Sequence, residues 1–300
     1  MKIQFLKAAI AVFILCSIPA MCSGAYADTM IVGWKGWYTN WEPGGMRIME
    51  KLTTASYAYG GYPIHLEKKA ADGYLTGPTM GYQMGDWSLG VSCMFINKFD
   101  YKMGGIGYDF SSANPFPVIS RTKMNRSEVD AALSYSIFSW LKVFAGYKYQ
   151  RLSYNIWHLM GGIFMAVDNE YDLHMPTAGL AFYIPILDNL NIGAQAGVLY
   201  LVPHSSNESA PATNNVFMFF LLRKVSDLRL DPSFGFNGEA MINFILMERV
   251  IIQAGYRYQI FKLHGKTRLN EYHLPGVSSG SAMDVFQGVT CSVSYALTTN

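Results

Sequence analysis

The residues with the clearest chemical potential are a histidine and a serine two positions apart, His204 and Ser206. On an extended strand such residues share a face, so the imidazole of His204 could act as base for a Ser206 nucleophile. Glu208 lies two residues further on and would orient the imidazole if the strand continued. The sequence from Asn207 to Pro211 is typical of a loop, however, and a flexible loop does not hold catalytic groups in a fixed geometry. We therefore expect a polar loop without catalysis here, with hydrolysis through His204 and Ser206 as the alternative.

A second pair with chemical potential is Asp172 and His174, also two residues apart. The spacing resembles the Asp-x-His pair that the omptin proteases use, together with paired acids, at the rim of a ten-stranded barrel. No Asp-x-Asp motif occurs in this sequence, and Pro176 disturbs the strand pattern beside the pair. We interpret the pair as part of a solvated loop edge. The six histidines are scattered and none forms a His-x-x-x-His pair, so we expect neither a metal nor another cofactor.

The elements that must position these residues are stretches of about ten residues in which every second residue is apolar. In residues 127–137 the odd-numbered positions from Val129 to Ile137 are apolar, while the even-numbered ones are small, polar or charged. No helical layer is available to cover the apolar faces. Lipid is therefore the medium that covers them, and the polar faces line a closed barrel.

Ten such strands follow from the sequence, with approximate ranges 29–42, 74–84, 87–102, 122–137, 141–157, 171–186, 190–203, 229–246, 250–264 and 283–297. Four connections are tight turns: Gly85-Asp86, Phe138–Trp140, Leu187–Asn189 and Met247–Arg249. Five are long loops: 43–73, 103–121, 158–170, 204–228 and 265–282. Alternation of short periplasmic turns with long outer loops is typical of outer-membrane barrels. The sequence predicts an all-β fold, a closed antiparallel transmembrane β-barrel of ten strands with both termini in the periplasm. Twelve strands are the alternative, if Thr53–Leu66 and Val216–Arg223 are strands as well.

Residues 1–27 read as a cleavable export signal, in which Lys2 and Lys7 flank an apolar run that begins at Ala8 and ends at Ala20. We expect residues 28–300 to form the barrel, in the outer membrane of a Gram-negative bacterium. Removing residues 1–27 lowers the number of Lys and Arg from 23 to 21, which equals the 21 Asp and Glu. A net charge near zero gives no electrostatic basis for binding nucleic acid. The expected partner is outer-membrane lipid, which covers the apolar faces of the strands.

Charges on the inner face of the predicted barrel need partners, and the turn lengths supply them. If the second and fourth tight turns are each three residues long, Asp130 lies opposite Lys148 and Glu239 lies opposite Arg257. Directly opposed residues have Cβ atoms about 4.5–5.5 Å apart. Both hairpins therefore predict an ion pair in the lumen.

The two cysteines beyond the signal, Cys93 and Cys291, alternate in phase with apolar neighbours on two different strands. Both thiols are expected to face lipid, where neither can reach the other across the lumen. The sequence therefore predicts unpaired cysteines that pack as small hydrophobic residues.

Connection 204–228 is the loop that most suggests a function of its own. It is polar through Ser205–Asn215 and then apolar over the seven residues Val216–Leu222, followed by Arg223 and Lys224. Burying a large apolar side chain is worth about 1.5–3 kcal/mol. The segment is therefore expected to pack on the neighbouring loops or the barrel mouth, to enter the outer leaflet, or to bind an apolar ligand.

Several glycine- and aromatic-rich segments resemble uncharacterised Gram-negative outer-membrane β-barrel proteins, and the resemblance covers most of residues 29–297. These segments are Gly33–Tyr38, Gly77–Tyr82, Asp86–Gly90 and Phe144–Tyr149. The resemblance implies folding by the outer-membrane assembly machinery. In the last strand, Tyr295 and Leu297 are the apolar positions of the corresponding recognition signal, although Thr298-Thr299-Asn300 follow where an aromatic residue commonly ends the chain.

Eight strands already enclose an interior that side chains can fill, whereas open aqueous channels need about sixteen. Ten strands therefore exclude a wide porin. We expect a non-enzymatic, porin-like barrel that acts through its extracellular loops or as a narrow or gated pathway for a small solute, with an apolar ligand at the outer loops as a further partner. The alternatives are a lipid hydrolase, similar to the outer-membrane phospholipases and lipid-A deacylases, and a surface adhesion or binding protein.

Overall fold

The computed structural model of the chain describes residues 29–42, 65–66, 71–97, 99–108, 115–160, 163–208, 212–213, 229–247, 249–266 and 279–298. The expected signal peptide and the apolar segment 216–222 lie outside these residues. Every regular element of the described part is a β-strand. No helix in it is long and apolar enough to span a membrane.

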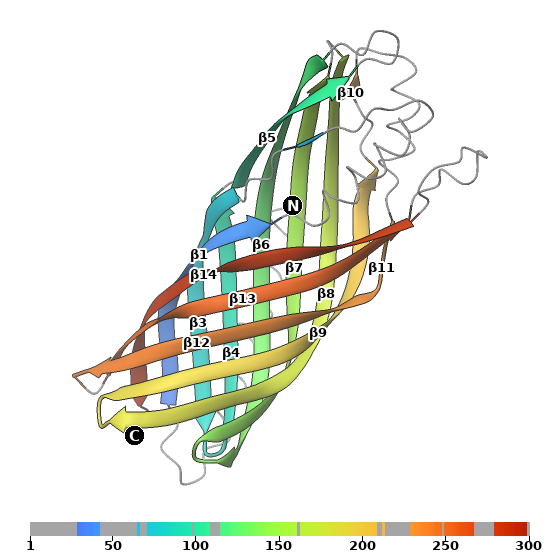
Figure 1. Cartoon of the computed structure of the whole chain (residues 1–300). Coiled ribbons are helices and arrows are strands. Elements are labelled where there is room, and N and C mark those ends of the chain that lie inside the picture. Colours follow the sequence, from blue (N-terminus) through green and yellow to red (C-terminus); the bar gives the residue numbers. More distant parts are fainter. Residues whose placement is uncertain are drawn as a thin grey trace.

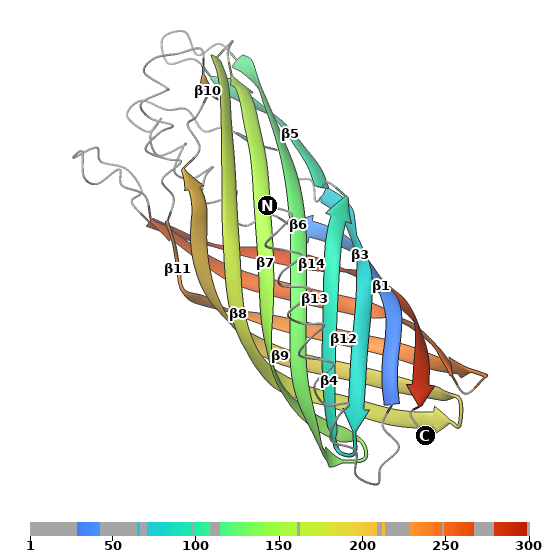
Figure 2. The same cartoon turned by 180° about the vertical axis from the view of Figure 1, so that it is seen from behind.

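Ten antiparallel strands form a closed ring, as the sequence predicted (Figures 1 and 2). In ring order they are β1 (Thr29–Glu42), β3 (Ala71–Met84), β4 (Trp87–Asn97), β6 (Pro115–Phe138), β7 (Leu141–Met160), β8 (Ile163–Leu187), β9 (Leu190–Glu208), β12 (Ser233–Leu246), β13 (Val250–Lys266) and β14 (Ser279–Thr298). The ring closes where β14 pairs with β1, from Thr29 opposite Thr298 to Glu42 opposite Val285. The first and last described residues are therefore neighbours at the same end of the barrel.

Four short strands extend this ring without adding to it. β5 (Phe99–Tyr108) continues the line of β4 along β6, and β2 (His65–Leu66) pairs with β5. β10 (Ala212–Thr213) pairs with β8, and β11 (Arg229–Asp231) pairs with β13. The twelve-strand alternative is wrong for the described part of the chain, because the part of Thr53–Leu66 that is described lies outside the ring.

Tight turns join the strands at one end, and two of them differ in detail from the expectation. The turn predicted at Phe138–Trp140 contains two residues, because Phe138 pairs with Leu141 and the register shifts between Ser136 and Phe138. The same arrangement occurs at the next turn, where Leu187 pairs with Leu190. At each of these turns the strand before the turn contains one extra, unpaired residue in place of the third turn residue. The pairing beyond this bulge is therefore the one that a three-residue turn predicts. At the first turn Gly85 has a φ of 55°, which a residue without a Cβ adopts at no steric cost.

Two connections predicted as long loops are largely strands. The segments 103–121 and 158–170 continue β5, β6, β7 and β8 far beyond the other strands, as Figures 1 and 2 show. On these strands the outward-facing side chains are mostly polar, among them Arg121, Lys123, Asn155 and Asp168. The apolar alternation that marks a strand in lipid ends there although the hydrogen-bonded ladder continues, which is why the sequence pattern placed the strand ends too early. We call this projecting part the outer extension.

The barrel exterior is an apolar belt bounded by aromatic side chains, as the alternation predicted. Toward the outer end the exposed aromatics are Tyr38, Tyr74, Phe95, Tyr147, Tyr200, Phe234 and Tyr256. Near the turns they are Trp87, Tyr135, Phe138, Trp140, Phe182, Tyr183, Phe244 and Tyr295. Two aromatic girdles around an apolar band are the exterior of a transmembrane barrel.

Both cysteines are free and lie on different strands, as predicted. Cys291 on β14 is opposite Gly36 of β1, and β3 separates β1 from the strand that carries Cys93. Three strand spacings of about 4.7–4.9 Å exceed the Cα separation of about 4.4–6.8 Å that a disulfide allows.

We expect Gly73→Ala to destabilise the barrel and Gly90→Ala to leave its stability unchanged. A Cβ at residue 73 would lie 2.3 Å from a ring carbon of Phe99, whereas no heavy atom lies within 4 Å of a Cβ at residue 90. Overpacking of this kind costs about 1–3 kcal/mol. Urea unfolding in detergent, followed by the heat-modifiable band on gels, measures the difference. Equal free energies of unfolding for the two variants would contradict the packing of Phe99 on β3.

Candidate functional site in the barrel lumen

The predicted pairing of Asp130 with Lys148 is present. The two residues are direct partners on β6 and β7, and the Lys148 Nζ lies 3.1 Å from the Asp130 Oδ2. Both side chains point into the barrel because their positions alternate with the lipid-facing residues of the same strands. The Lys148 side chain is almost fully buried, while 27% of the Asp130 side chain is exposed.

The second predicted pair has the expected register but different ionic partners. Glu239 is opposite Arg257 on β12 and β13. Its carboxylate, however, accepts hydrogen bonds from the Lys35 Nζ at 2.8 and 3.0 Å and from the Gln195 Nε2 at 3.0 Å. Arg257 instead binds Glu128, with its Nη1 3.0 Å from the Glu128 Oε1. Register fixes only the Cβ positions, and these long side chains reach partners across the lumen as easily as on the neighbouring strand.

Glu128 is the centre of the resulting network. It is fully buried and lies within ion-pair distance of three cations: Arg126 at 2.6 Å, Lys148 at 3.3 Å and Arg257 at 3.0 Å. Its own strand, β6, and the strand of Arg257, β13, are five steps apart in either direction around the ring. The Glu128–Arg257 bridge therefore joins opposite walls of the barrel. We refer to Glu128, its three cations, Asp130, Glu239 and Lys35 as the charge network.

A second contact crosses the lumen at the same level. The Arg126 Nη2 donates to the Gln259 Oε1 of β13 at 2.7 Å. Arg126 and Gln259 are both fully or almost fully buried. Two adjacent inward positions of β6 are thus bound to two adjacent inward positions of β13, which holds the opposite walls together.

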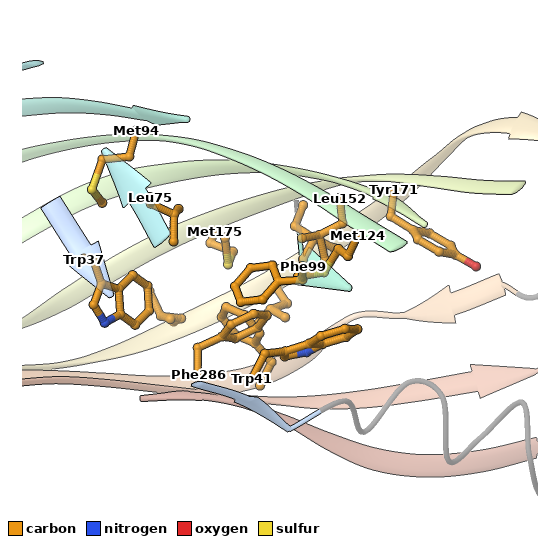
Figure 3. Packing of buried hydrophobic residues seen from close by; sticks show 14 of the residues in the cluster. Trp37, Trp41, Leu75, Met94, Phe99, Met124, Leu152, Tyr171, Met175 and Phe286 are labelled. Atoms are coloured by element: carbon orange, nitrogen blue, oxygen red, sulfur yellow. The ribbon is translucent and has the colours of Figure 1, made fainter. Parts of the chain in front are cut away.

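An aromatic layer lies next to the charge network on the outer side. Figure 3 shows Trp37, Trp41, Phe99 and Phe286 of this layer. Its members are Trp37, Trp41, Phe99, Phe261 and Phe286, all buried. The Phe286 ring is central: it stacks on Trp41 with centroids 6.1 Å apart and meets Phe99 edge-on at 6.4 Å. Arg126 joins the two layers, because its guanidinium lies 4.2 Å from the Phe286 centroid and 5.2 Å from that of Trp37. Aromatic rings and ion pairs thus pack against each other inside the barrel.

On the turn side of the charge network the lumen widens into a cavity of about 270 Å³, which we call the lower cavity. It is lined by charges of both signs, including Lys35, Asp130, Glu239 and Arg257, and by hydroxyl and amide groups such as Ser134. Lys35 and Asp130 are the most accessible of these charges, with 20% and 27% of their side chains exposed. The Lys35 ammonium is bound to the carboxylate of Glu239, and the Asp130 carboxylate is bound to the ammonium of Lys148. Lys35 can still donate a hydrogen bond to another group, and Asp130 can still accept one.

Arg126 is the functional residue that the sequence reasoning missed. It has the same parity as Glu128 and Asp130, which was signal enough to place it inside the barrel. Turn lengths and alternation relate residues of the same or adjacent strands only. They could not predict the contacts of β6 with β13 across the lumen.

The two catalytic candidates of the sequence lie elsewhere. His204 is exposed on the outer face of β9, opposite Asp172 of β8. The register shifts just beyond it, since Tyr171 pairs with Ser205 and Glu170 with Asn207, so Ser206 is an extra residue in the strand. The regular two-residue alternation that would bring His204 and Ser206 to one face does not hold at this bulge.

Asp172 and His174 also point outward, and the interpretation as a loop edge is wrong, because both residues belong to β8. Tyrosines of β7 bind them: the Tyr149 hydroxyl donates to the Asp172 Oδ1 at 2.6 Å, and the Tyr147 hydroxyl is hydrogen bonded to the His174 Nδ1. These contacts lie where the aromatic girdle meets the polar outer extension. Within the described residues, no three His, Cys, Asp or Glu side chains are grouped as metal ligands would be.

No protein-family model matches the chain, and no curated protein matches its sequence. Solved structures similar to it include the outer-membrane protease OmpT of Escherichia coli, with 9% identity over 91% of this chain and 97% of OmpT and a TM-score of 0.47. The outer-membrane protein OprG of Pseudomonas aeruginosa has 11% identity over 90% of this chain and 96% of its own, with a TM-score of 0.38. The toluene transporter TodX of Pseudomonas putida has 11% identity over 91% and 90%, with a TM-score of 0.29. Likenesses this distant carry no statement about activity.

The class of the protein follows from its own structure. A closed antiparallel ring of ten strands, an apolar belt with two aromatic girdles and a polar interior are the construction of bacterial outer-membrane barrels. The chain is a transmembrane β-barrel protein of the bacterial outer membrane.

We expect Glu128→Gln to destabilise the barrel much more than Asp130→Asn. Glu128 is fully buried among three cations, and all three would lose this shared carboxylate. Removing one partner of a buried ion pair costs about 3–5 kcal/mol. Asp130 has a single cation and contact with the lower cavity, so its loss should cost about 1 kcal/mol or less. Urea unfolding of the two variants under identical conditions measures both values, and a larger loss for Asp130→Asn would refute the central position of Glu128.

Proposed function

We propose that this protein is a gated pathway for a small polar solute, closed at rest by the charge network and the aromatic layer. The observation that carries the proposal is the Glu128–Arg257 bridge, which joins opposite walls directly above the lower cavity. A barrel of ten strands is narrow enough for one such bridge to block it.

The chemistry of the block favours a closure that opens. Glu128 is shared by three cations, so Arg257 can leave it without stranding the carboxylate. Gln150 lies fully buried on β7, and neither atom of its amide has a hydrogen-bond partner among the described residues. An unsatisfied buried polar group costs about 1–3 kcal/mol. A closed state that carries such a cost is easier to exchange for a hydrated, open one.

The lower cavity supports the choice of a small polar solute. Its accessible charges are one ammonium and one carboxylate, Lys35 and Asp130, beside the side chains of Asn237 and Gln195. Such a lining offers hydrogen bonds to both acidic and basic groups of a solute. The cavity would hold a solute on the periplasmic side while the layers above it remain closed.

Removing both partners of the cross-lumen bridge should open the barrel. In planar bilayers we expect little or no conductance from the wild-type protein and frequent, larger openings from Glu128→Ser with Arg257→Ser. The matched control is Glu170→Ser with Arg151→Ser, which removes an ion pair of the same residue types from the outer face of β7 and β8. Both variants must show the heat-modifiable band of a folded barrel. A bridge variant that folds and stays as closed as the wild type would rule out the gate.

We further propose that the barrel is not a hydrolase. His204 is exposed on the outer face, and the bulge at Ser206 removes the alternation that would pair the two. A fluorophosphonate probe should not label the folded wild-type protein. The wild type and a Ser206→Ala variant should show the same background labelling. Labelling of the wild type that disappears in Ser206→Ala would establish a reactive serine and overturn this part of the proposal.

A further inference from the structure

The outer extension carries a cluster of charged residues, mostly cations, on the side that faces away from the lumen. It consists of Asp100 and Lys102 on β5 and of Arg121 and Lys123 on β6, and we call it the basic cluster. Asp100 is directly opposite Lys123, and Lys102 is directly opposite Arg121. These four residues alternate with Phe99, Thr122 and Met124, which are buried inside, so the cluster faces away from the lumen.

The charges of the basic cluster are not balanced. Arg121 uses its guanidinium on Asp100, with the Nε donating to the Oδ1 at 2.7 Å and a second hydrogen bond from the Nη2 to the Oδ2. These bonds hold the pKa of the Asp100 carboxyl below its ordinary value, so that Arg121 and Asp100 neutralise one another. Lys102 and Lys123 are both exposed, and neither has an ion-pair partner among the described residues. Two cations therefore remain on diagonal positions, which lie about 7–8 Å apart.

Asp100 stabilises the sheet where it lies opposite Lys123, but the remaining charges of the cluster do not. Like charges directly opposite each other, such as Lys102 and Arg121, destabilise a sheet. On the neighbouring strands the equivalent cation is satisfied, since Arg151 is bound to Glu170 and lies 3.9 Å from Asp172. Among the side chains that the structure describes in the extension, the surplus positive charge lies on β5 and β6.

The position of the basic cluster relative to the apolar belt indicates what it meets. The last exposed apolar side chain below it is Phe95, whose partner on β6 is Ser127, four residues from Lys123. At about 3.3 Å per residue and a strand tilt of about 35–45°, Lys123 lies roughly 10 Å beyond the belt. The head-group region extends about 5–8 Å beyond the hydrocarbon, and a lysine side chain bends back toward it.

We propose that the basic cluster binds the phosphate groups of an anionic lipid of the outer leaflet. Lys102 and Lys123 act as the two point charges, and the neutral Arg121–Asp100 pair between them keeps them apart. Each such cation near an anionic surface contributes about 1 kcal/mol, or a factor of about five in affinity. This binding fixes the outer extension against the membrane and is independent of whether the lumen conducts.

The experiment compares the wild type with the double variant Lys102→Gln, Lys123→Gln in detergent. Bis-phosphorylated lipid A, the same lipid without phosphates, and inorganic phosphate are the probes, and native mass spectrometry counts the bound molecules. The matched control is Lys262→Gln, which removes one exposed cation from the outer face of β13. The double variant keeps the Arg121–Asp100 pair and therefore the only ion pair of the cluster.

The wild type and Lys262→Gln should bind the phosphorylated lipid at least tenfold more tightly than the dephosphorylated one, and the double variant should lose this preference. Equal binding of both lipids by the wild type would overturn the proposal whether or not the double variant folds. Undiminished preference in a folded double variant would overturn it as well. Inorganic phosphate should displace the lipid only weakly; displacement at equal concentration would assign the site to a free anion instead.

Discussion

The pairing of β14 with β1 is the constraint on which the whole structure depends. In lipid, backbone N–H and C=O groups have no water to bond with, so a sheet that spans a membrane must have no edge. The fourteen residue pairs from Thr29–Thr298 to Glu42–Val285 remove both edges at once. Closure of the ring then divides every strand into an outward set and an inward set, which is why apolar and polar residues alternate so regularly.

Closure also determines what the interior can be. In a ring of ten strands the side chains of opposite strands are long enough to meet. Charged residues on the inner face therefore form ion pairs with residues of strands that are far apart in the ring. Glu128 shows the consequence: it binds a residue on its own strand, one on the adjacent strand and one on the strand opposite. The ion pairs here are structural contacts across a narrow space, and in the function that we propose the same contacts close the passage. In this proposal, stability and closure of the lumen depend on the same atoms.

The ring ends at different heights around its circumference. β6, β7 and β8 have 20 to 25 residues each, whereas β1, β3 and β12 have 14. A transmembrane strand needs about 9–11 residues. The additional length on one side carries polar residues outward and large apolar residues such as Leu152 and Leu173 inward. This side of the barrel thus extends as a sheet beyond the membrane, where we propose that the cations of β5 and β6 meet the lipid head groups.

The sequence by itself determined the ring of ten strands, the facing of each strand, the free cysteines and the register of two hairpins. These properties are local, because alternation and turn length act between residues on the same or adjacent strands. Asp130 and Lys148 could be paired on that basis. The true partners of Glu239 and Arg257, and the part played by Arg126, could not, since they depend on which residues of non-adjacent walls meet across the lumen. The same limit applies to the outer extension, where the apolar pattern ends with the lipid but the hydrogen-bonded ladder continues. Only the closed tertiary structure brings β6 opposite β13, and with it the Glu128–Arg257 bridge across the lumen.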